Sequence, residues 1–158
     1  MNTAAAQLGV IAAMSLAAAG ATWLLKGPPA PPAAFHCDAK EIGEDEICLA
    51  DVAGNVIWVD ARTRSEWEEN GLDGSILWNM DPKEDQNEME AGAMMRIAAA
   101  GADLVVVYCG SKACGTSKEI AHRIRALGTG TKVKTLHGGW DALRGRGRNP
   151  LTDSSSGP

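Results

Sequence analysis

The fold is decided by the stretch LVVVYCGSKACGTSKEIAHRIRAL, which comprises residues 104–127. It opens with a continuous apolar run over 104–108, the pattern of a central strand that is covered on both faces. It closes with a helical pattern over 117–127, in which three apolar residues share one face: Ile120, Ile124 and Leu127. A buried strand followed by a helix is typical of an α/β domain with a mainly parallel sheet, where sites form at the carboxyl ends of strands.

A loop of small residues joins this strand to this helix, and Cys109 stands at its start. Thr116 and Glu119 have the spacing of a capping box, so the helix is expected to begin at Ser117. Backbone N–H groups in such a loop, together with the helix N-terminus, favour an anion and lower the pKa of a nearby thiol below its free value of about 8.5. We therefore predict a nucleophilic Cys109 with an anion-binding loop made of Gly110, Ser111, Lys112, Ala113, Cys114, Gly115 and Thr116. The alternative is an ordinary buried cysteine that ends a core strand.

The rest of the chain alternates strand-like and helical patterns. Strands are expected at 56–59, 75–78 and 133–136, and helices at 64–70 and 84–100. This alternation favours helices that flank a mainly parallel sheet.

The composition of the chain excludes some classes of function. The chain has 158 residues, 45% hydrophobic and 22% charged, which suits one compact domain. Its net charge of −5 argues against nucleic acid as a partner, because phosphate binding needs a basic face. The region 36–103 has five basic and seventeen acidic residues, whereas 104–158 has nine basic and three acidic residues. The C-terminal half is therefore expected to bind an anion.

The remaining cysteines are Cys37 and Cys48, and the chain has no C-x-x-C pair. The spacing therefore favours neither a zinc site nor a thioredoxin-like redox site. A disulfide between Cys37 and Cys48 is left open by the sequence, which does not give their geometry.

The N-terminal stretch 4–25 has no charged residue and is rich in alanine and leucine. Its length suits a single-pass membrane helix, and a cleaved signal or a soluble alanine-rich helix are the alternatives. The expected organisation is a transmembrane helix or signal anchor at 1–26, a Pro/Ala-rich linker at 27–35, a folded domain at 36–150 and a disordered tail at 151–158. The side of the membrane is left open.

Several motifs together resemble the rhodanese family over roughly residues 48–150. They are Asp60-Ala61-Arg62, Arg64-Ser65-Glu66-Trp67, the Tyr108-Cys109 loop and Leu136-His137-Gly138-Gly139-Trp140-Asp141-Ala142-Leu143. The resemblance implies one rhodanese-like domain whose cysteine carries a persulfide. Sulfur would pass from a small anionic donor such as thiosulfate to a cyanide or thiol acceptor, and no metal or organic cofactor would be needed.

The other motif residues are expected to support the fold. Asp60, Arg62 and Glu66 are expected to form an ion-pair cluster that fixes a loop, and Trp140 to pack the last helix beneath the sheet. His137 is expected to contact an anion or to serve as a turn residue, and His122 to be solvated.

The loop departs from simple rhodaneses because Cys114 stands where a cation is usual and Gly115 precedes Thr116. This departure leaves open which anionic donor the loop prefers. The loop lacks the late arginine that a rhodanese-fold phosphatase needs to grip phosphate. Cys114 is either a resolving thiol that forms a disulfide with Cys109, as in a redox-linked sulfur carrier, or a small inward-facing residue. The competing class of function is a membrane-tethered, non-catalytic rhodanese-like module used for binding or regulation.

Overall fold

The computed structural model describes residues 7–8, 11, 14–15, 35–38, 40–111 and 114–144. The chain divides into two units, Met1–Ala34 and Phe35–Pro158. Among the described residues, no helix is both long and apolar enough to cross a bilayer. Most of the expected membrane helix, the linker apart from Phe35, and the C-terminal tail lie outside the described residues.

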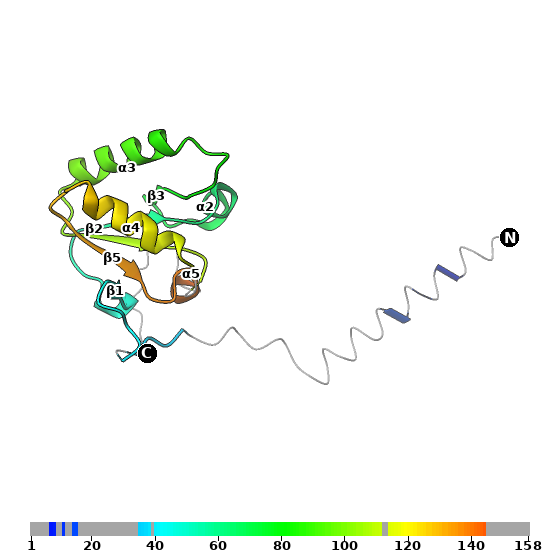
Figure 1. Ribbon diagram of the computed structural model, residues 1–158. Coiled ribbons are helices and arrows are strands. Elements are labelled where there is room, and N and C mark those ends of the chain that lie inside the picture. Colours follow the sequence, from blue (N-terminus) through cyan, green and yellow to red (C-terminus); the bar gives the residue numbers. More distant parts are fainter. Residues whose placement is uncertain are drawn as a thin grey trace. The chain divides into compact units, whose positions relative to one another are not determined.

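A five-stranded parallel sheet organises the second unit (Figure 1). Its strands are β1 (Glu46–Ile47), β2 (Val56–Asp60), β3 (Ile76–Leu77), β4 (Leu104–Tyr108) and β5 (Lys132–Leu136). They lie in the order β1-β5-β4-β2-β3, so the apolar strand β4 is central. The predicted α/β fold with a mainly parallel sheet is confirmed, while β1 is an additional edge strand that the sequence patterns did not indicate.

Helices connect the strands. They are η1 (Leu49–Asp51, a single 3-10 turn), α2 (Arg64–Asn70), α3 (Gln86–Ala100), α4 (Thr116–Ala126) and α5 (Trp140–Leu143). Helix α3 begins later than expected because the Asp85 side chain caps it, accepting hydrogen bonds from the backbone N–H groups of Asn87 and Glu88. Helix α4 begins at Thr116, one residue earlier than expected.

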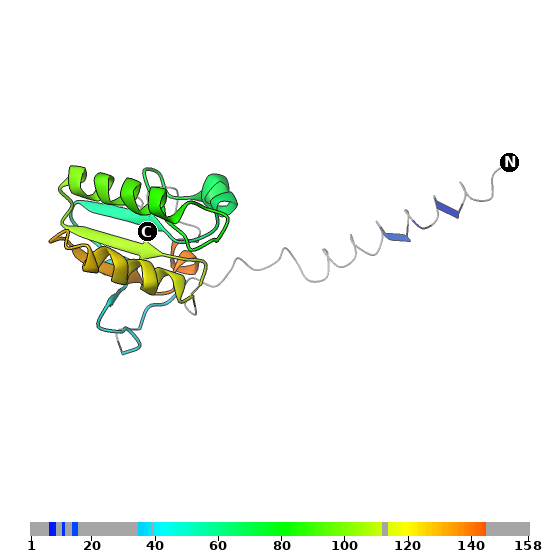
Figure 2. The ribbon, with the colours of Figure 1, turned by 45° about the horizontal axis from the view of Figure 1, so that its top comes forward.

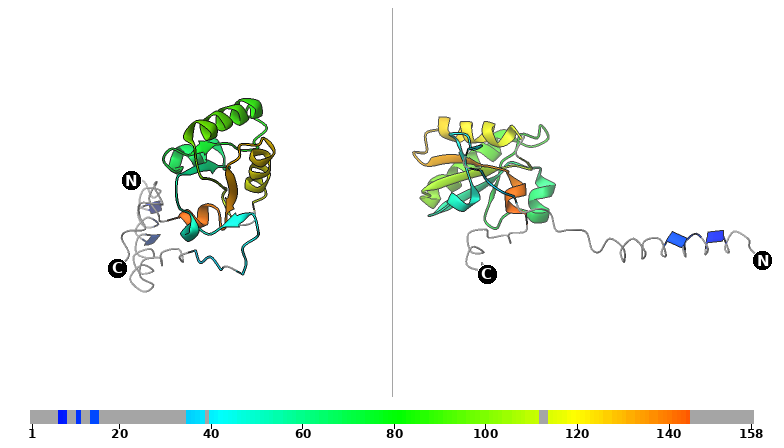
Figure 3. Two further views of the ribbon diagram at one scale, coloured as in Figure 1. Left: turned by 90° about the vertical axis from the view of Figure 1, so that its left-hand side faces the viewer. Right: turned by 90° about the horizontal axis from the view of Figure 1, so that it is seen from below.

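Apolar side chains cover both faces of the sheet. On one face, residues of α3 and α4 pack against alternate residues of β2 and β4, including Val59, Val105 and Val107. Both helices lie on this face, and in the view of Figure 2 the strands β2 and β4 are seen in the gap between α3 (green) and α4 (yellow). On the other face, Trp58, Val106 and Tyr108 pack against residues that include Leu143 of α5, and Figure 3 (right) shows α4 and α5 on opposite sides of the strands. Strand β4 is therefore apolar throughout because both of its faces are buried.

The strand register brings the candidate residues to one edge of the sheet. Asp60 at the end of β2 pairs with Leu77 of β3 on one side and with Tyr108 of β4 on the other. The residues that follow these strands, among them Arg62 and Cys109, therefore share the carboxyl edge, where parallel α/β sheets place their sites.

Ile97 and Met95 of α3 test how far this packing stabilises the fold. Ile97 is 1% exposed in the core, whereas Met95 is 70% exposed. We expect Ile97→Ala to lower the free energy of unfolding by about 2–5 kcal/mol, because it leaves a cavity, and Met95→Ala to change it by less than about 0.5 kcal/mol. Urea denaturation of the full chain measures both, and equal losses would contradict the assignment of the core face.

Candidate active site

Cys109 is the first residue after β4, and its side chain is 1% exposed. It forms a disulfide with Cys114, and the two Cα atoms are 6.4 Å apart. The Cys109 Sγ also lies 3.5 Å from the carbonyl oxygen of Ser111. The two thiols of the loop are thus within bonding reach of each other, at the edge where the strands end.

The structure describes only part of the loop that is expected to bind an anion. The Cys114 N–H donates to the Ser111 carbonyl over 3.2 Å, so this amide is used within the loop in the disulfide form. Lys112 and Ala113 lie outside the described residues, while Gly110, Ser111, Gly115 and Thr116 are described.

The capping box expected at Thr116 is wrong. Gly115 is the N-cap, has helical backbone angles and makes no side-chain cap bond, and Thr116 already belongs to α4. A capping side chain must come from a residue with extended backbone, which Thr116 does not have. Glu119 instead pairs with Arg123 over 3.1 Å.

A buried ion pair lies beside the cysteine. Asp60 is 0% and Arg62 5% exposed, and the Arg62 Nη2 lies 2.7 Å from the Asp60 Oδ2. The Tyr108 hydroxyl donates to the same Asp60 oxygen over 2.7 Å, and the Arg62 Nη1 donates to the Asn70 Oδ1 over 2.8 Å. Desolvation of a charge is costly unless it is paired and hydrogen-bonded, and these bonds meet that requirement for both residues.

The surroundings of Arg62 and Tyr108 shift the pKa values of these two side chains. Burial lowers the pKa of Arg62, but the hydrogen bond and charge of Asp60 raise that pKa by more, so the guanidinium stays charged. Burial, and then the Asp60 carboxylate, raise the pKa of Tyr108, so its hydroxyl keeps its proton and remains a donor.

Trp140 links this ion pair to Cys109, because it contacts Arg62 with its ring and Cys109 with its backbone. The guanidinium carbon of Arg62 lies 3.9 Å from the Trp140 ring centroid, a cation–π contact. The Trp140 backbone N–H donates to the Cys109 carbonyl over 2.6 Å. Gly139 precedes Trp140 at a φ of 55°, and a Cβ there would collide with the same carbonyl. Only glycine allows this close approach without strain. Trp140 itself is the first residue of α5 and packs against the core cluster on the face of the sheet that α5 covers.

Glu66 lies outside the ion-pair cluster. The structure joins Asp60 to Arg62, but the Glu66 carboxylate accepts from the Thr63 hydroxyl over 2.6 Å and from the Thr63 N–H over 3.1 Å. The Thr63 side chain accepts in turn from the Glu66 N–H, which completes a capping box at the start of α2. The hydrogen bond from the Thr63 hydroxyl lowers the pKa of Glu66. Its structural role is therefore local to α2.

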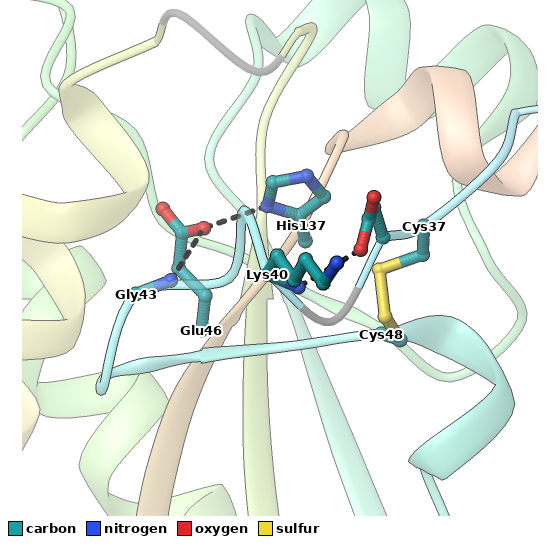
Figure 4. Close-up of a disulfide and its surroundings, with 7 residues drawn as sticks. Cys37, Lys40, Gly43, Glu46, Cys48 and His137 are labelled. Carbon is teal, nitrogen blue, oxygen red and sulfur yellow. Dashed lines mark hydrogen bonds and ion pairs between the residues drawn. A yellow bond between two sulfur atoms is a disulfide. The ribbon is translucent and has the colours of Figure 1, made fainter.

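His137 directly follows β5 and is buried, 2% exposed, so it is not placed to contact a dissolved anion. Its Nδ1 lies 2.7 Å from the Glu46 Oε2, and the Lys118 Nζ lies 2.9 Å from the Glu46 Oε1 (Figure 4 shows the His137 contact). Partial burial raises the pKa of Glu46, but hydrogen bonds from His137, Lys118 and the Gly43 N–H outweigh it and lower the pKa to about 2. Glu46 thus ties the first turn of α4 to the edge strand β1.

The Cys37–Cys48 disulfide, which the sequence left open, is present, with Cα atoms 5.9 Å apart (Figure 4). Phe35 lies just before it, and the Phe35 and His137 ring centroids are 5.8 Å apart. A Cβ at Gly138 would collide with the Phe35 ring. The start of the domain is therefore packed on the glycine turn that positions Cys109.

The sequence reasoning missed four contributors to this site: Glu46, Asn70, Lys118 and the hydroxyl of Tyr108. Each acts through a contact between residues that are distant in sequence, or eight positions apart in the case of Arg62 and Asn70. Local patterns carry no signal for such pairs. Among the described residues, no group of three His, Cys, Asp or Glu side chains is placed to hold a metal ion.

Comparison with known proteins identifies the family. Residues 49–145 match the family model of the rhodanese-like domain, and because this is more than half of the chain, the chain belongs to that family. Among solved structures, it is similar to the BH2092 protein from Bacillus halodurans, with 21% identity, a TM-score of 0.46, and coverage of 67% of this chain and 77% of that one. No curated protein matches the chain.

Because the Asp60–Arg62 pair is buried, we expect its loss to destabilise the fold more than the loss of a more exposed ion pair. Asp60→Asn leaves the Arg62 charge buried without a carboxylate, so we expect the free energy of unfolding to fall by about 3–5 kcal/mol. Glu84→Gln breaks the Arg64–Glu84 pair, in which the Arg64 side chain is half exposed, and should cost no more than about 1 kcal/mol. Chemical denaturation checks both, and a neutral Asp60→Asn would mean that the ion pair does not support the fold.

Glu46 predicts how stability depends on pH. Its folded-state pKa of about 2 lies below the ordinary value of 4.5, so its contribution is present above the ordinary value and is lost as the pH falls toward 2. We expect Glu46→Gln to flatten the fall in unfolding free energy between pH 5 and pH 2, measured by denaturation at each pH. Glu88→Gln, at an exposed position of α3, is the control. Parallel curves for wild type and Glu46→Gln would refute this account.

Proposed function

We propose that this member of the rhodanese-like domain family is a sulfurtransferase that carries sulfane sulfur as a persulfide on Cys109. The donor is a small anion such as thiosulfate, and the acceptor is thiophilic, such as a thiol or cyanide. One observation carries the proposal: a strand-end cysteine lies within bonding reach of a second cysteine in the same loop. Two cysteines in this position suit both the loading and the release of sulfur.

In the loading step, the Cys109 thiolate attacks the outer sulfur of thiosulfate. The sulfur–sulfur bond of thiosulfate breaks, and sulfite leaves with the electron pair. Helix α4 supports this step because it begins beside the loop, and the partial positive charge at a helix N-terminus favours an anion there. An external acceptor then attacks the outer sulfur and releases Cys109 as a thiolate.

Cys114 offers a second route of release, which makes the protein a redox-linked sulfur carrier. The Cys114 thiolate attacks the Sγ of a protonated Cys109 persulfide, the bond to the outer sulfur breaks, and hydrosulfide leaves. The product is the Cys109–Cys114 disulfide, the bond found in the structure. A dithiol then reduces this disulfide to two thiols and is itself oxidised to a disulfide.

Two variants, compared with the wild type, separate these roles. After reduction by a dithiol and its removal, the full chain is treated with thiosulfate, and intact mass and released sulfide are measured. Cys114→Ser should gain one sulfur and keep it until cyanide converts it to thiocyanate. Wild type should release sulfide and form the Cys109–Cys114 disulfide, because the resolving thiol is present.

Cys109→Ser is the matched control and should neither gain sulfur nor yield thiocyanate. A folded Cys114→Ser protein that gains no sulfur would refute the proposal and favour the non-catalytic binding or regulatory module. If wild type and Cys114→Ser hold the persulfide equally long, Cys109 carries sulfur but Cys114 has no resolving role.

A further inference from the structure

Trp78 carries a buried donor without a partner. Its side chain follows β3 and is 0% exposed, and its Nε1 has no hydrogen-bond partner among the described residues. The partly buried indole of Trp67 differs, because its Nε1 donates to the Ser75 hydroxyl over 2.9 Å. Native proteins leave few buried polar atoms unpaired, and each such atom calls for an explanation. The indole N–H of Trp78 is therefore a candidate to bind a group that is absent from the disulfide form.

The strand register places Trp78 in one row with Cys109. The backbone N–H of Trp78 donates to the Asp60 carbonyl over 3.0 Å, and the backbone N–H of Ala61 donates to the Tyr108 carbonyl over 2.8 Å, so the ladder continues past the strand ends. Trp78, Ala61 and Cys109 follow Leu77, Asp60 and Tyr108, which pair across β3, β2 and β4. Along this row the position between Trp78 and Cys109 is occupied by Ala61, whose side chain is a single methyl group.

The same three side chains lie on one face of the sheet. Trp78, Ala61 and Cys109 belong to the core cluster beneath α3 and α4, and Cys114 packs against that cluster. Alternate residues of a strand point to opposite faces, and Tyr108 accordingly lies in the other cluster. A large buried indole thus shares its face and row with the cysteine that carries sulfur under the proposed function.

We propose that the Nε1–H of Trp78 donates a hydrogen bond to the outer sulfur of a persulfide on Cys109 and favours its anionic form. The proposal rests on the persulfide of the proposed function and adds a residue that sets its ionisation. An indole N–H is a donor only, so it suits an anionic sulfur and not a cation. Hydrogen bonds to a charged form lower the pKa of an acid, and burial alone would raise it.

The test measures the ionisation of the persulfide without relying on thiosulfate. In the full chain with Cys114→Ser, Cys109 is loaded by polysulfide, and the rate at which iodoacetamide alkylates the outer sulfur is followed against pH by peptide mass. We expect Trp78→Phe to raise the midpoint of this profile by about one pH unit, which corresponds to about a tenfold change in the ionisation constant.

Trp58→Phe is the matched control, because Trp58 is a buried tryptophan on the opposite face of the neighbouring strand. It should leave the midpoint unchanged. Benzothienylalanine at position 78 removes only the N–H and keeps the shape of the ring, so it should reproduce the shift even if Trp78→Phe does not fold.

An unchanged midpoint in both Trp78 variants would overturn the inference, as would an equal shift in Trp58→Phe. The two proposals fail separately in this design. If thiosulfate loads no sulfur, but the polysulfide-loaded persulfide shows the Trp78-dependent shift, the proposed transfer reaction is wrong and the role of Trp78 stands.

Discussion

Asp60 carries a negative charge at a point where the protein leaves it no contact with water, and the edge of the sheet is arranged around that charge. Arg62 supplies the opposite charge, and Tyr108 supplies a hydroxyl hydrogen bond. The Arg62 guanidinium that pairs with Asp60 also lies against the ring of Trp140. The backbone N–H of Trp140 in turn donates a hydrogen bond to the carbonyl of Cys109. The charge pairing that Asp60 needs at the end of β2 therefore also helps to fix the position of Cys109 after β4.

The elements predicted best are those whose signals are local. The run 104–108 and the helix 64–70 match the structure at both ends, because β-branched residues or a helical pattern bounded by polar residues define them. β1 was missed because it has only two residues and exists through its pairing with β5, far along the chain. Two Thr-x-x-Glu patterns occur, and only the one at Thr63 forms a capping box, since the backbone at Thr116 is already helical.

The parts of the site that could be predicted are those whose place in the fold follows from the local sequence pattern. Cys109 could be placed at a strand end from the sequence, and so could the small residues that follow it. The pairing of Cys109 with Cys114, five residues apart in one loop, was one of the two alternatives that the sequence left open. The bond between His137 and Glu46 and the stacking of Arg62 on Trp140 depend on how the loops return to the sheet. These contacts join separate segments, and no periodicity or composition encodes them.

The Cys37–Cys48 disulfide has a mechanical consequence. It joins the segment around Phe35 to the chain just after β1 by a covalent bond. Without that bond, tension on the chain before Phe35 would be carried by ring contacts with His137 and Gly138, and then by the two-residue strand β1. With it, a covalent bond two residues after Phe35 shares this load and passes part of it into Cys48 and η1. The start of the domain is therefore not held on the glycine turn beneath Cys109 by ring contacts alone.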